Sequence, residues 1–148
     1  MIIRAELKDL QEILELQYQA YQSEAILLNN FQIQPLTQTL EEMTEEYQNG
    51  VFYKAVDENG KIIGSVRGRV DNSTLYIGKL MVHPSYRGQG IGSELLQHIE
   101  AENPHLRKEL YTSSLSENNL RLYEKNGYKR FQAKPTGEGF SFVYLEKE

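Results

Sequence analysis

The chain has 148 residues, of which 39% are hydrophobic and 25% charged, and this is the composition of an ordinary globular domain. Its net charge of −5 argues against a nucleic-acid binder, which would present a basic patch, and the lack of cysteine excludes disulfides, thiolate metal sites and a cysteine nucleophile. No stretch approaches the ~20 apolar residues of a membrane span and no signal-like segment starts the chain, so we expect one cytoplasmic domain over residues 1–148.

The first fifty residues predict one short strand and two helices. Ile2 and Ile3 form the strand, and apolar residues at three- and four-residue steps predict a helix over 6–22. The segment 25–36 has no clean periodicity and contains Pro35, so we expect a loop there. A second helix over 39–48 is capped by Thr37 or Thr39 and ends at Asn49-Gly50.

The next segment changes to β-branched and aromatic residues. Turn signals at 58–60 and 71–73 divide it into three antiparallel strands, at about 51–57, 61–70 and 74–82. In the third strand the two-residue alternation of apolar side chains breaks at Gly78-Lys79. A β-bulge would produce this break, and so would a strand that is buried on both faces.

The C-terminal part predicts two helices and three strands. A helix over 92–102 ends at Asn103-Pro104, and a strand follows at 109–114. A helix of about nine residues then starts at Ser116 or Asn118 and ends at Gly127, and strands 128–133 and 139–147 flank a turn over 135–139. The whole order predicts a mixed α/β fold, with a central sheet covered by helices.

The stretch "HPSYRGQGIGSELL", residues 83–96, places three glycines directly before a helix. Backbone N–H groups at a helix N-terminus bind anions, and glycines let the main chain approach a phosphate closely. A P-loop needs a lysine after its last glycine, and none is present here. A dinucleotide-binding fingerprint needs a tight turn straight after a strand, whereas residues 83–87 intervene. We therefore predict a different kind of phosphate site.

This stretch resembles the acyl-CoA motif of the GNAT family, the Gcn5-related N-acetyltransferases. The motif Arg/Gln-x-x-Gly-x-Gly/Ala is met by residues 87–92, preceded by Leu80, Val82 and Pro84. The later "LYEKNGY" resembles the family's Leu-Tyr-x-x-x-Gly-Phe/Tyr signature, and the order of elements is similar over residues 1–148. The resemblance implies a sheet of about seven mostly antiparallel strands with helices on both faces, and an interrupted fourth strand that agrees with a bulge at Gly78-Lys79.

The resemblance also implies the cofactor site for acetyl-CoA. In this family the pyrophosphate lies on the loop amides, here those of Arg87, Gly88, Gln89, Gly90, Ile91, Gly92 and Ser93. Pantetheine runs where the fourth and fifth strands separate and pairs with main-chain groups near Met81 and Val82, whose N–H polarises the thioester carbonyl. Asn119 is a further candidate, because the asparagine that the family often places seven residues before its tyrosine is Ser116 here. Lys125 is a candidate for the 3′-phosphate of the coenzyme, the alternative being a solvated surface residue.

Tyr123 corresponds to the family's tyrosine that protonates the departing thiolate, although helical spacing also suits it for packing alone. The general base is less well defined, since the fourth strand contains no acidic residue. Glu24 is the first candidate, and Glu41, Glu42 and His83 are the alternatives. The three histidines lack metal-ligand spacing, so we expect no metal.

The predicted function is transfer of the acetyl group of acetyl-CoA to a primary amine by direct attack in a ternary complex. The acceptor would be a small polar molecule or a peptide, bound by residues 20–40, including Tyr21, Glu24, Asn29, Asn30, Phe31 and Gln34. We expect no nucleic-acid or membrane partner, and a homodimer is compatible with the family. A non-catalytic acyl-CoA-binding module on the same fold is the alternative function, and a nucleotide binder on another fold is a distant third.

Overall fold

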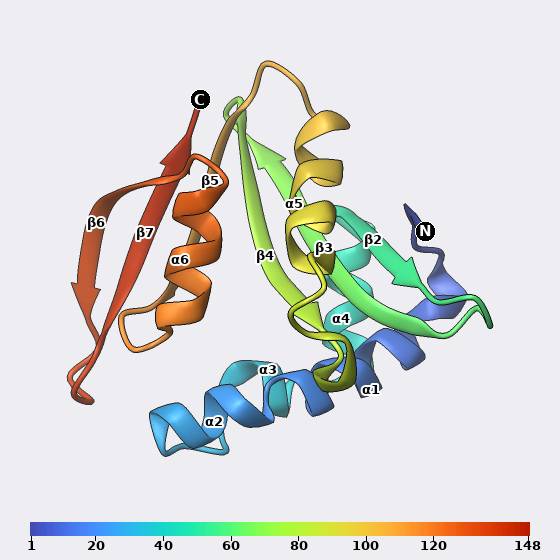
Figure 1. Ribbon diagram of the computed structural model, residues 1–148, viewed down its shortest axis with the longest axis horizontal. Coiled ribbons are helices and arrows are strands. Elements are labelled where there is room, and N and C mark those ends of the chain that lie inside the picture. The colour runs from blue at the N-terminus through green and yellow to red at the C-terminus, as the bar shows by residue number, and fades with distance from the viewer.

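The computed structural model describes residues 1–148 as one sheet with helices around it (Figure 1). In chain order the elements are β1 (Ile2–Arg4), η1 (Leu7–Asp9), α1 (Leu10–Ala20), α2 (Gln22–Leu28), α3 (Gln34–Thr37), α4 (Leu40–Gln48), β2 (Val51–Val56), β3 (Ile62–Asp71), β4 (Thr74–Val82), η2 (Pro84–Tyr86), α5 (Ile91–Ala101), β5 (Arg107–Ser113), α6 (Glu117–Lys125), β6 (Lys129–Pro135) and β7 (Ser141–Lys147).

The sheet has seven strands in the order β1-β2-β3-β4-β5-β7-β6. All neighbours pair antiparallel except β4 and β5, which are parallel. The predicted mixed, mostly antiparallel sheet is therefore confirmed, and the strand boundaries differ from the predicted ones by at most two residues.

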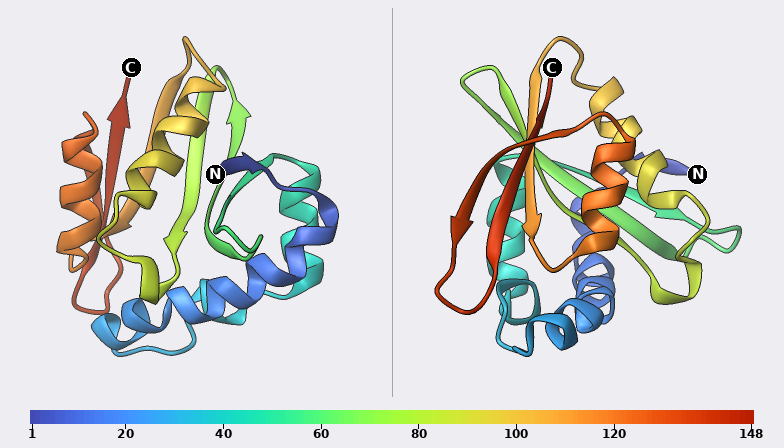
Figure 2. Two further views of the ribbon diagram at one scale, coloured as in Figure 1. Left: turned by 45° about the vertical axis from the view of Figure 1, so that its right-hand side comes forward. Right: turned by 60° about the vertical axis from the view of Figure 1, so that its left-hand side comes forward.

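Helices cover both faces of this sheet, as predicted. One buried cluster joins α5 and α6 to the sheet through residues such as Leu95, Ile99 and Leu120, and a separate cluster joins α1 and α4 to the other face through Ile13 and Met43. Figure 2 shows α4 on one side of the strands and α5 and α6 on the other. None of the helices has the length and hydropathy needed to cross a membrane.

The alternation break in β4 is a β-bulge. On β3, Ser65 and Arg67 are two residues apart, but their partners Met81 and Gly78 are three apart, so β4 carries one extra residue. Lys79 lies in this bulge with a left-handed φ of 51°. The first of the two interpretations of this strand is thus correct.

The segment 25–36 is not the predicted loop, because α2 and α3 occupy most of it. Helix α2 follows a break at Tyr21 and ends at Asn29, which adopts the left-handed conformation typical of helix C-termini. Pro35 lies in the first turn of α3, where its missing N–H is not needed, so it starts a helix instead of interrupting one. At α4, Thr39 and not Thr37 is the cap, and it forms a capping box with Glu42.

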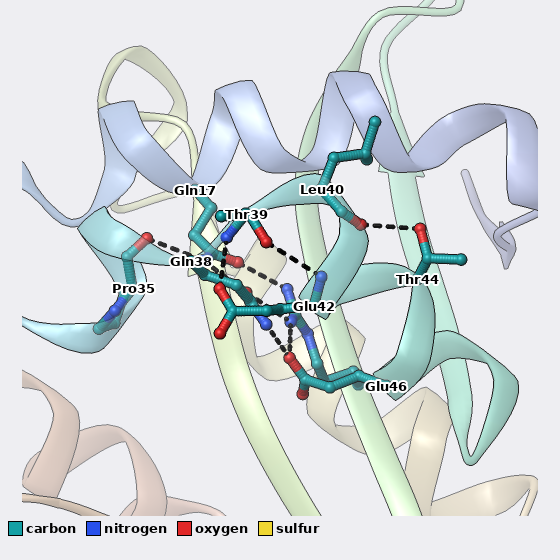
Figure 3. A network of polar contacts seen from close by, with 9 residues as sticks. Gln17, Pro35, Gln38, Thr39, Leu40, Glu42, Thr44 and Glu46 are labelled. Atoms are coloured by element: carbon teal, nitrogen blue, oxygen red, sulfur yellow. Dashed lines mark hydrogen bonds and ion pairs between the residues drawn. The ribbon is translucent and has the colours of Figure 1, made fainter.

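A network of polar side chains, which includes Gln17, Gln38 and Glu46 (Figure 3), links the helices of one face to Arg67 on β3. The Arg67 guanidinium donates to Gln17 Oε1 at 2.7 Å and to Glu46 Oε1 at 3.0 Å, and it lies over the Phe52 ring. Gln38 completes the network by donating to Glu46 and accepting from Gln17. Because Gln17 and Gln38 are almost fully buried, their amides depend on these partners.

We expect Arg67→Met to lower the free energy of unfolding by about 2–4 kcal/mol, since the buried amides of Gln17 and Gln38 would lose a partner. Urea unfolding measures this loss. Arg69→Met is the matched control on the same strand: the Arg69 side chain is 57% exposed, and its removal should cost about 0.5 kcal/mol or less. Equal losses in the two variants would contradict a structural role for the network.

Candidate active site

The glycine loop leads from the end of β4 into α5. Gly88 and Gly90 have φ values of 81° and 83°, which residues with a side chain rarely adopt. A Cβ at either position would meet no atom within 4 Å, so the surface of the loop is open. Gly90 is the N-cap of α5, and no side chain caps the helix. The first N–H groups of α5 are therefore free to bind an anion.

The rest of the loop motif fixes its position. Ile91 packs on the core, and a Cβ at Gly92 would lie in ordinary contact, 3.4 Å from the Leu122 side chain of α6. Asn126 donates to the Ser93 hydroxyl at 3.2 Å and so joins α6 to the start of α5. Gln89 is exposed. Within this motif, the backbone N–H groups at the start of α5 and the exposed Gln89 side chain are available to a ligand.

Arg87 has an internal role that the motif does not indicate. Its guanidinium donates to the carbonyl of Ala20 at 2.7 Å, to Ser23 Oγ at 3.1 Å and to the carbonyl of Val82 at 3.3 Å. These contacts join the loop to the junction of α1 and α2 and to the end of β4. In this conformation the side chain positions the loop, and each of its three nitrogens donates one hydrogen bond to a protein atom.

A cavity of about 640 Å³ opens where β4 and β5 separate. The two strands pair only from Thr74 to Tyr76, and beyond that point they diverge above α2 and α3 (Figure 1). The cavity is lined from every side of this opening by Tyr21, Glu24, Leu28, Asn29, Asn30, Ile33, Gln34, Pro35, Ile77, Gly78, Lys79, Leu80, Tyr111, Thr112, Ser113, Asn119, Tyr123, Glu138, Phe140 and Phe142. Its size is typical of a small-molecule site.

Tyr123 lines this cavity and is only 7% exposed, with its ring near that of Tyr128. Burial, and to a smaller degree the negative charge of Glu24, raises the pKa of the Tyr123 hydroxyl well above its ordinary value. The phenol is therefore protonated at neutral pH. It can act as a proton donor inside the cavity.

Glu24 lies in the same cavity, on α2. The Ser116 hydroxyl donates to Glu24 Oε1 at 2.6 Å, across 92 residues of sequence. Ser116, which departs from the family pattern, therefore orients a carboxylate here. Both are at least half-buried, so the carboxylate is held in one position.

The other predicted cofactor residues lie in different surroundings. Asn119 lines the cavity and donates to Thr112 at 3.2 Å, whereas Lys125 is exposed at the end of α6 and does not line it. The Met81 side chain is buried under α1, so only its main chain is available to a ligand. The His83 N–H donates to Ile63 on β3, and therefore the preceding N–H, that of Val82, is directed away from β3.

Of the residues predicted for the acceptor, Tyr21, Asn29, Asn30 and Gln34 line the cavity, and Phe31 does not. The alternative bases Glu41, Glu42 and His83 are also absent from its lining. Sequence reasoning missed Lys79 and the hairpin residues Glu138 and Phe140. The break of alternation at Gly78-Lys79 was the available signal for Lys79, but nothing in the sequence places the last hairpin beside the first helices.

The open mixed sheet and the glycine loop after β4 match the fold that the resemblance to acyl-CoA-dependent acetyltransferases implied, and the comparisons agree. The acetyltransferase (GNAT) family model matches residues 7–128, so the chain belongs to the GNAT family. The chain is 30% identical to acetyltransferase Atu2258 of Agrobacterium fabrum over 96 residues, which cover 62% of this chain and 68% of that protein.

Two further proteins show how far this similarity extends. The chain is 27% identical to the UPF0157 protein YqkA of Bacillus subtilis over 86% of its own length but only 37% of YqkA. The structure of the PaiA N-acetyltransferase of Thermoplasma acidophilum in complex with coenzyme A superposes with a TM-score of 0.82. It is 18% identical and covers 100% of this chain and 98% of that one, which shows the same fold.

Replacing Arg87 by methionine should lower the free energy of unfolding by about 1–3 kcal/mol without any ligand, because the guanidinium contacts of the loop would be lost. Chemical denaturation of the free protein measures the change. Arg121→Met serves as the control, because Arg121 is 77% exposed and makes only a 4.0 Å ion pair. If Arg87→Met is as stable as this control, the side chain has no role in positioning the loop.

Proposed function

We propose that this chain is an N-acetyltransferase that moves the acetyl group of acetyl-CoA to the primary amine of a small polar molecule or a peptide. The observation that carries the proposal is the cavity at the opening of the sheet, which holds a protonated phenol and an oriented carboxylate; the glycine loop follows the same strand, β4, that lines the cavity. The coenzyme A in the Thermoplasma relative supports the choice of co-substrate.

The loop residues fit a pyrophosphate. Residues 87–93 offer uncapped N–H groups at the positive end of the α5 dipole, and the open space above Gly88 and Gly90 leaves room for phosphate oxygens. Acetyl-CoA supplies an activated thioester when bound. The Val82 N–H, which points away from β3, would donate to the thioester carbonyl as negative charge develops there.

The two ionisable groups of the cavity would move protons in opposite directions. Glu24 would accept a proton from the acceptor ammonium, so that the neutral amine attacks the carbonyl carbon. After the attack the nitrogen still carries one proton more than an amide, and as the carbon–sulfur bond breaks this proton would pass through the Tyr123 hydroxyl to the leaving thiolate, so that Tyr123 ends protonated. The products are an amide and a free thiol. No covalent acyl-enzyme is needed, in agreement with a chain that lacks cysteine.

A thermal melt with acetyl-CoA is the first test of this function. A ligand at 100 times its dissociation constant adds about 2.7 kcal/mol, which should raise the midpoint by about 5–10 °C in a domain of this size. ATP and NAD are the control ligands. Gly90→Ala should lose the shift, whereas Gly60→Ala, with a similar φ of 80° and equally open surroundings, should keep it. No shift in the wild type would refute the pyrophosphate site.

Tyr123→Phe and Glu24→Gln should each lower kcat by about 10²-fold or more while leaving acetyl-CoA affinity unchanged. Because the pKa of Tyr123 is raised, the phenol stays protonated, and kcat at saturating acceptor should not fall on the alkaline side below about pH 10. Thiol release measures turnover. Tyr47→Phe, whose hydroxyl only contacts the Ala5 carbonyl, is the control. A chain that binds acetyl-CoA without releasing thiol with any amine would be a binding module.

A further inference from the structure

A second cavity, of about 630 Å³, adjoins the first one at the β4 bulge. It lies between α4 and the strands β3, β4, β5 and β7. The two cavities share Ile77, Gly78, Lys79 and Tyr111, so Lys79 stands at the junction between them. Its position is a consequence of the bulge, since Lys79 is a bulge residue with a left-handed backbone conformation.

Each acidic side chain around the two cavities either has a hydrogen-bond or ion-pair partner or lies in solvent, and none forms an ion pair with Lys79. Glu24 accepts from Ser116, and Glu42 accepts from the Thr39 backbone N–H. The remaining paired acids are Glu46, which binds Arg67 at 3.0 Å, and Glu109, which binds Arg107 at 2.8 Å. Glu45 and Glu138 have no partner, but both are exposed, and water screens their charges.

Among the cations, Lys79 alone combines partial burial with the absence of a partner. Arg67 is paired, as above, and Arg69 is exposed and lies 3.9 Å from Asp71. The Lys79 ammonium makes no hydrogen bond or ion pair with any protein atom, although the side chain is half-buried. An amine that approaches the thioester as a simple cation would meet an uncompensated positive charge at this junction.

The surroundings of Lys79 also oppose its charge. Burial, and secondly the positive charge of Arg67, lowers the pKa of the Lys79 ammonium, and the carboxylate of Glu46 only partly offsets this effect. An anionic ligand group at the junction would relieve this deficit by forming charge-assisted hydrogen bonds. The same group would place its attached amine in the cavity that contains Glu24 and Tyr123.

We infer that Lys79 binds an anionic group of the acceptor, so that the acceptor is an amine that also carries a carboxylate or a similar oxyanion, as an amino acid does. This inference rests on the proposed N-acetyltransferase function and defines its substrate class. Lys79 is the specificity-determining residue and takes no part in proton transfer. The carboxylate contacts Lys79, and the amine faces Glu24.

The test compares matched amines in the wild type and in variants of Lys79. The panel pairs each common L-amino acid, and β-alanine, with its carboxamide, and adds ethylenediamine as a dication. Lys79→Met removes the charge and keeps an unbranched side chain that suits the left-handed backbone, and Lys79→Arg retains the charge. Lys129→Met, a change at an exposed lysine on β6, is the control. Thiol release gives kcat/KM, and calorimetry on the protein–CoA complex gives amine affinity.

The wild type should prefer the carboxylated member of at least one pair. Lys79→Met should lower kcat/KM for that amine at least about tenfold relative to its carboxamide, mainly through KM, while Lys79→Arg and Lys129→Met retain the preference. Three results would overturn the inference: preference for the carboxamides or ethylenediamine, an equal loss for both members of a pair in Lys79→Met, or a preference that persists without the charge.

Calorimetry separates this inference from the proposed function. If acetyl-CoA binds but no amine releases thiol, the transferase function fails. Lys79-dependent binding of a carboxylated amine to the protein–CoA complex would then still support the inference. If no carboxylated amine binds, or if binding is the same in Lys79→Met, the inference is wrong whatever the outcome for catalysis.

Discussion

The separation of β4 from β5 is the constraint on which the rest of the structure depends. Parallel pairing holds the two strands together only from Thr74 to Tyr76, and the bulge at Lys79 then changes the course of β4. Backbone groups beyond this point lack strand partners on the open side, so they are available to a ligand. The helices α2 and α3 and the β6–β7 hairpin enclose the opening, and the glycine loop follows directly from the end of β4.

Two sets of polar contacts keep the opening in shape. Arg67 and its amide partners join β3 to α1, the residue after α3, and α4, while Arg87 joins the glycine loop to the junction of α1 and α2. Both guanidinium groups donate to protein atoms, although the buried Nε of Arg67 has no partner. Lys79 differs from them because it has no protein partner and faces both cavities. Arg67 and Arg87 bind protein atoms and have structural roles, whereas Lys79 is the cation that we assign to the acceptor.

Much of the fold could be predicted from local patterns. Hairpin turn signals and the period of apolar residues predicted the seven strands and the helices that cover them, because these signals depend on neighbouring residues in the chain. The wrong prediction at 25–36 has a local cause too: Pro35 both interrupts helices and starts them, and the choice depends on its position in the turn. Helix α2 has only one fully buried residue, Ala25, so its apolar pattern was too weak to recognise.

The sequence alone determined the glycine loop, because backbone conformation at glycines and at helix starts is a short-range property. It also contained the motif of residues 122–128, which was recognised by its residue pattern. Tertiary structure decided everything that depends on contacts between distant segments. Ser116 meets Glu24 across 92 residues, Arg87 turns to the end of α1, and Lys79 reaches a junction of two cavities. Burial and the pairing of charges arise only when strands and helices pack, and they set which of the many charged residues remain without a partner.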